Sequence, residues 1–253
     1  MITRRLHVVG LAALGALAMM AARPALAADA QVAVAANFTE PAKRIAAAFK
    51  AATGHNAVLS FGSSGQFYAQ IARGAPYEVF LSADAERPER AEKEGVGAPK
   101  TRFTYAVGRL ALYSKTPGLV DEGGSVLKGE RFAKLAIADP AAAPYGAAAV
   151  QTMRKLGVYE TVKPKIVMGT SITQAYQFVA TGAAELGFVA LSQVVDEPGG
   201  SRWIVPAADH APIEQQAILL LPGRDSAAAK AFMAFLKSPA AVAIIKRYGY
   251  EVR

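Results

Sequence analysis

The stretch QVAVAANFTEPAKRIAAAFKAATGHNAVLSFGSSG, residues 31–65, decides the fold. Residues 31–36 form a short apolar run that is typical of a buried strand, and residues 40–53 then place apolar side chains at helical spacing. Gly54 ends this helix, because the left-handed residue that follows a last helical turn is most often glycine. Residues 57–61 form a second strand. The stretch therefore predicts two parallel strands joined by a helix.

The rest of the chain repeats this alternation of short apolar runs with segments of helical spacing. Further strands are predicted at residues 79–82, 110–114, 134–138, 165–168, 186–190 and 217–221. Further helices are predicted at residues 64–73, 88–94, 147–156, 172–181, 227–236 and 240–248. Because strands alternate with helices, the sheets should be mostly parallel and covered by helices. Two groups of similar size predict an α/β protein with two lobes.

The boundary between the predicted lobes carries no linker rich in proline and serine. This absence favours two strands that cross between the lobes over one flexible tether. We place the crossings near residues 105–108 and 211–216. Lobe I would then be discontinuous, with residues 28–106 and 213–253, and lobe II would consist of residues 107–212.

The first 27 residues have the composition of an export signal. Arg4 and Arg5 precede an almost wholly apolar stretch, residues 6–22, and residues 25–27 form a small-x-small cleavage site. A membrane anchor is the alternative interpretation, but the apolar stretch is short for a bilayer span and leads directly to the cleavage site. We therefore interpret residues 1–27 as a signal peptide and expect the mature protein outside the cytoplasm.

Charge and composition exclude several classes of function. Removing residues 1–27 takes away three arginines and no acidic residue, so the formal net charge falls from +8 to +5. The basic residues are scattered, without interleaved aromatic residues, so we expect no nucleic-acid partner. The chain has no cysteine, and His55 and His210 stand apart, without the spacing of metal ligands. We therefore expect no direct metal ligand and no resident cofactor.

Four turns share a feature that suits an anion: a predicted strand ends in a small polar or glycine-containing turn, and a helix begins. They are residues 36–39, 62–65, 144–146 and 169–172. A helix N-terminus carries backbone N–H groups without partners and a partial positive charge. In open α/β sheets, ligands bind beyond the carboxyl ends of the strands, where these turns lie. If two turns from each lobe face each other, four helix N-termini converge on one cleft.

The hydrogen-bond donors in these turns define the ligand that such a cleft could hold. Asn37 offers its side-chain amide, and Ser64 offers a hydroxyl and an N–H. Tyr145 and Ile172 offer backbone N–H groups. Capping of the helix is the ordinary alternative role for Asn and Ser at such positions. None of the turns contains a carboxylate, and a site of donors alone disfavours phosphate, which carries a proton at neutral pH and needs an acceptor. Sulfate, molybdate and tungstate carry no proton and stay open.

A secreted serine hydrolase that uses Ser63 or Ser64 is an alternative function. The sequence Gly62-Ser63-Ser64-Gly65 does not match the Gly-x-Ser-x-Gly nucleophile elbow. Neither histidine of the mature chain can be tied to a serine from the sequence. The phosphate-binding loop Gly-x-x-x-x-Gly-Lys-Ser/Thr and the dinucleotide loop Gly-x-Gly-x-x-Gly are both absent. We therefore expect a binding protein and not an enzyme.

A set of short segments, in this order along the chain, points to a known family. They are residues 35–39 (AANFT), 60–65 (SFGSSG), 70–71 (QI), 74–76 (GAP), 80–84 (FLSAD), 138–140 (ADP), 185–190 (ELGFVA), 235–239 (FLKSP) and 246–250 (KRYGY). Through them the chain resembles the periplasmic molybdate-binding proteins of ABC-type molybdate importers, which are two-lobed periplasmic binding proteins with a type II-like fold. The resemblance covers nearly the whole chain after the signal peptide.

The resemblance implies a periplasmic, monomeric protein that binds molybdate or tungstate and delivers it to the membrane permease of an ABC transporter. It also implies that neutral donors from the four turns hold the oxyanion. By this similarity the binding residues are Ala36, Asn37, Ser63, Ser64, Tyr145 and Ile172. A binding protein for another anion, such as sulfate or a small organic anion, remains the alternative.

The chain departs from the family pattern at two positions. Ala190 stands where some members place a donor tyrosine, so Tyr145 or Asn37 would have to compensate. Glu78 stands where aspartate is usual, and we expect the fold to accommodate it. The missing tyrosine leaves open how many donors hold the anion and whether molybdate or tungstate is preferred.

Overall fold

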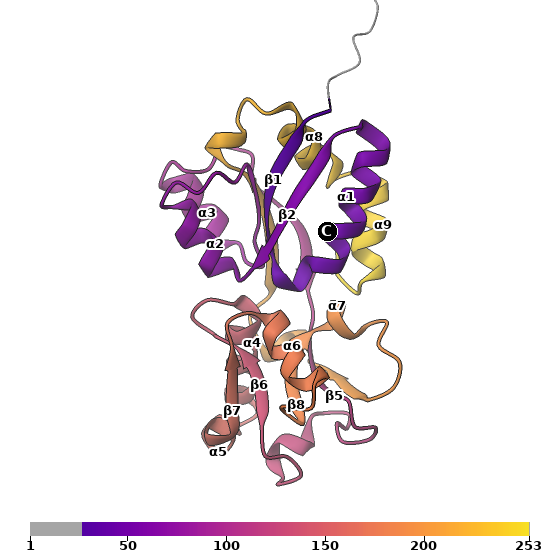
Figure 1. Ribbon diagram of the computed structural model, residues 1–253. Coiled ribbons are helices and arrows are strands. Elements are labelled where there is room, and N and C mark those ends of the chain that lie inside the picture. The colour runs from indigo at the N-terminus through magenta and orange to yellow at the C-terminus, as the bar shows by residue number, and fades with distance from the viewer. Residues whose placement is uncertain (1–26, 253) are drawn as a thin grey trace, which may run out of the picture.

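The computed structural model describes residues 27–252, which form two α/β lobes stacked one above the other (Figure 1). The predicted signal peptide, residues 1–27, lies outside the described residues except for its last residue. Each lobe is built on a five-stranded sheet flanked by helices. The predicted α/β class and the two-lobed arrangement are confirmed.

The sheet of the upper lobe combines strands from both ends of the chain. In the order in which they pair, its strands are β2 (Asn56–Gly62), β1 (Asp29–Ala35), β3 (Val79–Leu81), β10 (Ile213–Leu219) and β4 (Phe103–Gly108). β1, β2 and β3 are parallel, whereas β10 is antiparallel to both of its neighbours. The helices of this lobe are α1 (Thr39–Thr53), α2 (Ser64–Ile71), α3 (Glu86–Lys93), α8 (Ala227–Phe235) and α9 (Pro239–Arg247).

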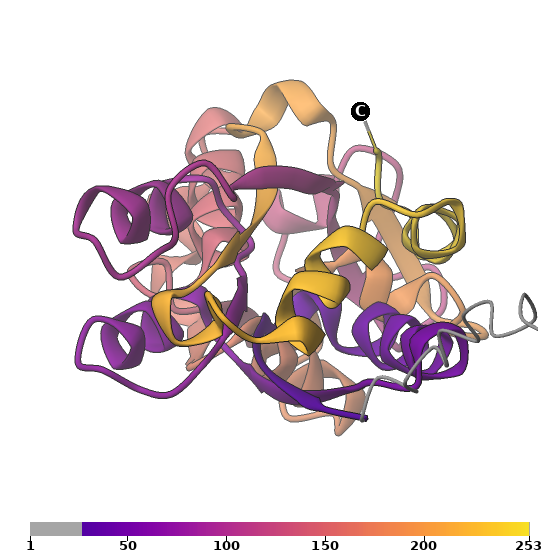
Figure 2. The same cartoon turned by 90° about the horizontal axis from the view of Figure 1, so that it is seen from above.

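Alternating side chains along β1 show how this sheet buries both of its faces. Val32 and Val34 pack in a core with residues of α1, α8 and α9, whereas Ala33 packs on the opposite face with residues of α2 and α3. Seen from above, these two groups of helices lie on opposite sides of the sheet (Figure 2). Because both faces are covered, β1 is almost continuously apolar, and this continuous apolar run is the signal that the sequence carries.

The lower lobe repeats the arrangement with the middle of the chain. Its strands pair in the order β7 (Ile166–Gly169), β6 (Leu135–Ala138), β8 (Leu186–Ala190), β5 (Leu110–Ser114) and β9 (Ser201–Ile204). β6 is parallel to β7 and β8, and β5 is antiparallel to β8 and β9. The helices of this lobe are α4 (Pro144–Lys155), α5 (Tyr159–Val162), α6 (Ile172–Ala180) and α7 (Leu191–Val194).

The chain crosses between the lobes twice. β4 ends at Gly108 in the upper sheet, and β5 begins at Leu110 in the lower one. On the return, β9 ends at Ile204 in the lower sheet, and β10 begins at Ile213, which pairs with Gly108. The two connections therefore meet side by side at the waist of the molecule. The exact residues at which the lobes divide stay a prediction.

Several elements differ from their sequence prediction for identifiable reasons. β9 is an edge strand in which only Trp203 is buried, so it shows no apolar alternation. β10 begins at Ile213, before the strand predicted at 217–221. The prediction misses this first half because it contains the polar side chains of Gln215 and Gln216, which are buried. α5 and α7 are four residues long, which is too short for a helical period to appear.

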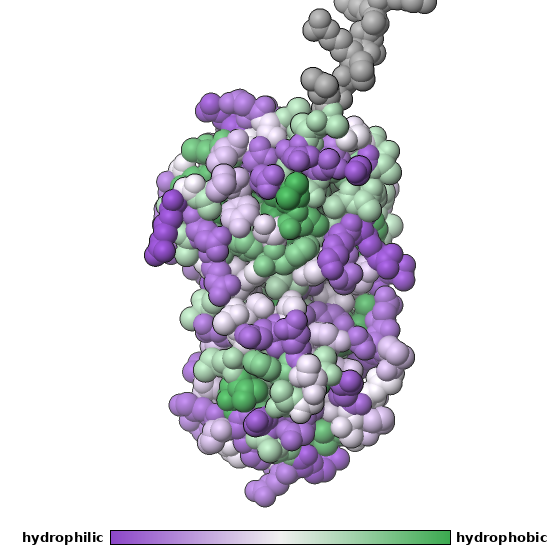
Figure 3. All heavy atoms as spheres, viewed as in Figure 1, coloured by the Kyte–Doolittle hydropathy of each residue, from purple (hydrophilic) through white to green (hydrophobic). Residues whose placement is uncertain are grey.

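The face of the molecule shown in Figure 3 mixes polar and apolar side chains on both lobes. Large apolar side chains are exposed at Val58 and Phe61 on the edge strand β2 and at Met168 on the edge strand β7. Scattered apolar side chains of this kind are ordinary on a folded surface. Within residues 27–252, no single helix has the length and apolarity to cross a membrane, although α8 and α9 pass that test together as a pair bent by 60°.

Candidate anion-binding site

A small cavity lies between the two lobes, and all six residues predicted to bind the anion line it. About 200 Å³ of space between atoms lies in it, part of it open to solvent. Its lining consists of Ala35, Ala36, Asn37, Ser63, Ser64 and Ala83 from the upper lobe and Ala143, Pro144, Tyr145 and Ile172 from the lower lobe. Ala190 is not among these residues. Each lobe thus contributes two of the four turns, as the sequence predicts.

Helix N-termini reach the cavity from both lobes. Ser64 is the first residue of α2, Tyr145 the second of α4 and Ile172 the first of α6. Asn37 lies in a short 3₁₀ helix, Ala36–Phe38, that leads into α1. The first N–H groups of a helix have no acceptor within the helix, so these starts present donors and partial positive charge to the space between the lobes.

The two adjacent serines have different roles. Ser63 is the N-cap of α2, where its Oγ accepts a hydrogen bond from the N–H of Gln66 at 3.4 Å. Ser64 Oγ instead accepts from the N–H of Ala83 at 2.9 Å. This bond occupies a lone pair of Ser64 and leaves its hydroxyl proton available. Capping, the alternative role considered for Ser64, therefore falls to Ser63, and Ser64 retains a donor at the cavity.

The side-chain amide of Asn37 does not donate to the cavity in the way that the sequence predicts. Its Nδ2 donates to Gln215 Oε1 at 2.8 Å and to the hydroxyl of Tyr250 at 3.0 Å, so both amide protons are used inside the protein. Its carbonyl oxygen accepts from Ser192 Oγ and from the hydroxyl of Tyr250, each at 2.8 Å. In this arrangement Asn37 is the centre of a buried polar network at the waist, and its amide N–H groups point away from the cavity.

Tyr145 contributes its backbone to the cavity and its hydroxyl to the same network. The hydroxyl accepts a hydrogen bond from Gln215 Nε2 at 3.2 Å. It fits only because position 108 is glycine, since a Cβ there would lie 2.1 Å from the hydroxyl oxygen. Burial raises the pKa of Tyr145 well above its ordinary value, so the hydroxyl keeps its proton. The side chain therefore belongs to the waist, not to the anion.

Formal charges are absent from the lining of the cavity. An ion pair of Asp84 with Arg87 begins at the residue after Ala83, which lines the cavity. The guanidinium of Arg87 also donates to the carbonyl oxygen of Ala141 at 3.1 Å. No group of three or more acidic or histidine side chains within residues 27–252 could hold a metal ion. A dianion in this cavity would therefore rely on neutral, pre-aimed donors, which can replace its water because hydrogen bonds to a charged acceptor are strong.

The lobes close directly over the cavity. The N–H of Gly65 in α2 donates to the carbonyl oxygen of Ala142 in the lower lobe at 2.9 Å. Thr173 Oγ1 of the lower lobe donates to the carbonyl oxygen of Ala36 at 3.3 Å. A Cβ at position 65 would lie 3.0 Å from both the Cα and the oxygen of Ala142, so glycine allows this close approach. These contacts join the two lobes beside the cavity.

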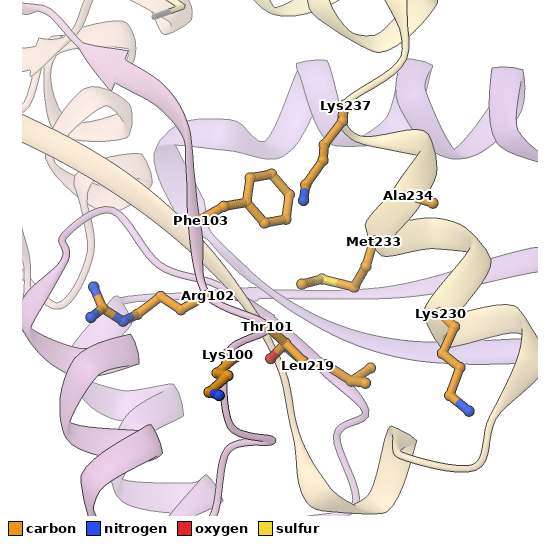
Figure 4. Close-up of a pocket in the computed structure, with 9 residues that line it drawn as sticks. All are labelled: Lys100, Thr101, Arg102, Phe103, Leu219, Lys230, Met233, Ala234 and Lys237. Atoms are coloured by element: carbon orange, nitrogen blue, oxygen red, sulfur yellow. The ribbon is translucent and has the colours of Figure 1, made fainter.

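A larger and more basic groove lies elsewhere, on the upper lobe between β4, β10 and α8 (Figure 4). It holds about 610 Å³ and is lined by Lys100, Thr101, Arg102, Phe103, Leu219, Lys230, Met233, Ala234 and Lys237. Its cationic groups point in different directions, and Lys237 Nζ lies 4.2 Å from the centre of the Phe103 ring. Arg102 already pairs with Glu92 at 3.3 Å. The groove therefore offers charge without a common point at which donors meet.

Neither serine at the cavity has a base beside it. The two histidines of the described residues do not line the cavity: His55 Nδ1 accepts from the N–H of Ala28 at 3.1 Å, and His210 is partly exposed and contacts the carbonyl oxygen of Ala211. The hydroxyls of Ser63 and Ser64 form hydrogen bonds with backbone N–H groups. This arrangement gives no support to the serine-hydrolase alternative.

A cavity of neutral donors between two α/β lobes joined by two connections is typical of the class of two-lobed solute-binding proteins. The chain belongs to the family of bacterial extracellular solute-binding proteins, whose family model matches residues 30–251.

Individual relatives are similar over nearly their full length. The molybdate-binding protein ModA of Rhodobacter capsulatus is 57% identical over 235 residues, which cover 93% of this chain and 93% of that protein. The molybdate-binding protein ModA of Azotobacter vinelandii is 56% identical over 232 residues, or 90% of this chain and 92% of that protein. Among solved structures, the periplasmic molybdate-binding protein of Azotobacter vinelandii matches with a TM-score of 0.86 and 44% identity, covering 88% of this chain and 99% of that one.

Proposed function

We propose that this protein binds molybdate or tungstate in the periplasm and delivers the oxyanion to the permease of an ABC importer. The observation that carries the proposal is the closed cavity lined only by neutral groups, with helix starts from both lobes around it. Relatives at 57% and 56% identity that bear the name molybdate-binding protein support the choice of ligand.

The chemistry of the cavity favours a small anion without a proton. Its donors are the hydroxyl of Ser64 and N–H groups at the starts of the 3₁₀ helix, α2, α4 and α6. Hydrogen phosphate would need an acceptor for its proton, and no carboxylate lines the cavity. Among proton-free tetrahedral anions, the size of the enclosed space then decides between sulfate and the larger molybdate and tungstate.

Closure of the lobes explains how binding can signal to a permease. Donors from the upper and lower lobes can reach the same anion only when the lobes are together, so the anion stabilises the closed state. The permease would then recognise the closed surface that spans both lobes. The protein acts as a monomer, without a resident cofactor, a nucleic-acid partner or a catalytic step of its own, and molybdate is its cargo.

Isothermal titration of the mature protein with molybdate, tungstate, sulfate and phosphate tests the proposal. Tight one-to-one binding of molybdate and tungstate, with no heat from sulfate and phosphate, is the expected result. Equal affinity for sulfate would favour the alternative of a general or sulfate-specific anion carrier. No binding of any of the four would refute the oxyanion ligand and direct the search to small organic anions.

A further inference from the structure

Gln215 connects the two lobes at the waist although it does not line the cavity. It lies in β10, fully buried, and its Oε1 accepts from Asn37 Nδ2 at 2.8 Å and from the hydroxyl of Tyr105 at 3.0 Å. Its Nε2 donates to the hydroxyl of Tyr145, from the lower lobe, at 3.2 Å. One amide therefore touches a cavity residue from each lobe.

The direction of the Gln215 amide sets the direction of the Asn37 amide. While Gln215 presents its oxygen, Asn37 must present its nitrogen, and both N–H groups of Asn37 are then used on Gln215 and Tyr250. No hydrogen bond among the described residues ends on Asn37 Oδ1. Because Asn37 lines the cavity, this oxygen would be an acceptor where a dianion needs a donor, and the arrangement opposes a proton-free oxyanion.

Rotating each side-chain amide by 180° about the bond to its amide carbon removes this conflict. The amide oxygen and nitrogen then exchange places, and no other atom has to move because the two atoms have nearly the same size. Gln215 Nε2 would then donate to Asn37 Oδ1 over the present 2.8 Å. Its second proton would point at the hydroxyl oxygen of Tyr105, which can donate to the carbonyl oxygen of Ser82 at 3.3 Å. Gln215 Oε1 would accept from the hydroxyl of Tyr145.

The other hydrogen-bond partners of Asn37, Tyr250 and Ser192, can also bond to the rotated amide and to the Asn37 backbone. The hydroxyl of Tyr250, 3.0 Å from the Asn37 amide, can redirect its one proton from the carbonyl oxygen of Asn37 to Oδ1. Ser192 Oγ continues to donate to the carbonyl oxygen of Asn37. Burial raises the pKa of Tyr250 to about 12, so its hydroxyl keeps the proton that this donation needs. The turned arrangement leaves the hydroxyls and amides of the network with partners and releases the N–H groups of Asn37 from Gln215 and Tyr250.

We propose that Gln215 is a positioning residue for the anion, and that binding of a proton-free oxyanion selects the turned state in which Asn37 Nδ2 donates to it. The inference rests on the proposed function and deepens it. Asn37 and Gln215 belong to the upper lobe, whereas Tyr145 and Ser192 leave them when the lobes open, so the amides can turn before closure. After this amide rotation, the cavity presents donors only. Without the rotation, Asn37 Oδ1 can accept the proton of hydrogen phosphate.

A double-mutant cycle in titrations with molybdate and phosphate tests this role. Gln215→Met keeps the side-chain length and removes both hydrogen-bonding groups, and it should weaken molybdate binding about tenfold to a hundredfold. It should also narrow the preference for molybdate over phosphate. In an Asn37→Ala background the same change should cost less than about twofold, because Gln215 acts through Asn37. An additional loss of full size in that background would overturn the proposal.

Gln216→Met provides the matched control. Gln216 is the next residue of β10, also buried, but it bonds to Thr104 and Arg102 and not to the network at the waist. The molybdate affinity of the Gln216→Met variant should stay within about twofold of that of the unaltered protein. Thermal unfolding of each ligand-free variant shows whether it is folded, so a general loss of structure is separated from a loss of positioning.

Neutron diffraction of deuterium-exchanged crystals gives a readout that does not depend on any variant. In the molybdate complex, the deuterons of Asn37 Nδ2 should face the anion, and those of Gln215 Nε2 should face Asn37 Oδ1 and Tyr105. Molybdate bound with Asn37 Nδ2 still on Gln215 Oε1 would overturn this inference and leave the proposed function intact. Failure of the unaltered protein to bind molybdate in the titration would overturn both.

Discussion

The cavity between the lobes and the basic groove beside α8 contrast in charge and in geometry. The groove has four cationic side chains and about 610 Å³ of space, whereas the cavity has no charged residue in its lining and about 200 Å³. In the groove the cations point apart (Figure 4), and one of them is paired with Glu92. In the cavity, helix starts from both lobes lie around one small space.

This difference shows that the number of positive charges is a poor guide to an anion site. A solvated lysine holds an anion weakly, because salt and water screen the attraction. Backbone N–H groups at helix starts are fixed by the helices that carry them, so they need little reorganisation when the anion enters, and they act where screening is small. The following changes in the cavity and in the groove test this contrast.

Asn37→Asp should have the largest effect. It places a negative charge on the wall of the cavity with a dianion beside it, and repulsion in a closed site with little water should weaken molybdate binding by about a thousandfold. Titration calorimetry measures the loss, and thermal unfolding without ligand checks the fold. Affinity equal to that of the unaltered protein would show that this turn does not face the anion.

Ser64→Ala should have the next largest effect. It removes a hydroxyl that accepts from Ala83 and has its proton free for the anion, so affinity should fall about tenfold to a hundredfold. Ser226→Ala is the control, since Ser226 caps α8 by accepting from the N–H of Ala229 at 3.2 Å, outside the cavity. The control should lose ~1 kcal/mol of unfolding free energy with unchanged affinity. Equal affinities for the two variants would contradict the donor role of Ser64.

Gly65→Ala should have a moderate effect that comes from closure. The new methyl group would lie 3.0 Å from the backbone of Ala142, so the closed state should lose ~1 kcal/mol and affinity should fall about fivefold. Stopped-flow kinetics should place the loss in faster release of the anion. Gly129→Ala is the control, because its φ of −104° suits alanine and its nearest contact lies at 3.6 Å. An unchanged release rate in Gly65→Ala would show that the lobes need not approach so closely here.

The fold could largely be predicted from apolar periodicity. β1 packs apolar residues on both faces of the sheet, so the sequence shows it directly. The start of β10 could not be found this way, because Gln215 and Gln216 are buried through hydrogen bonds and not through apolar contact. β9 has one buried residue, Trp203, and its place at the sheet edge depends on pairing with β5, which no local pattern reports.

The lining of the cavity could be predicted because each polar turn follows a strand and begins a helix. The roles within the lining could not. Whether Ser63 or Ser64 caps α2 depends on which hydroxyl meets the N–H of Ala83, a residue from another turn. The network behind Asn37 brings together Gln215 and Tyr250, which lie far along the chain. The two ends of the chain meet in one lobe and bring these residues together, so sequence periodicity carries no sign of the network.

Removing charge from the groove should have the smallest effect. In a variant with both Lys230→Gln and Lys237→Gln, molybdate affinity should stay within about twofold of that of the unaltered protein. The association rate should fall slightly at low salt and recover in 0.15 M salt, because two positive charges no longer attract the anion over a distance. Titration gives the affinity, and stopped-flow kinetics at two salt concentrations give the rate. A tenfold loss of affinity would mean that the groove itself holds the anion or alters closure, and the contrast between charge and aimed donors would then fail.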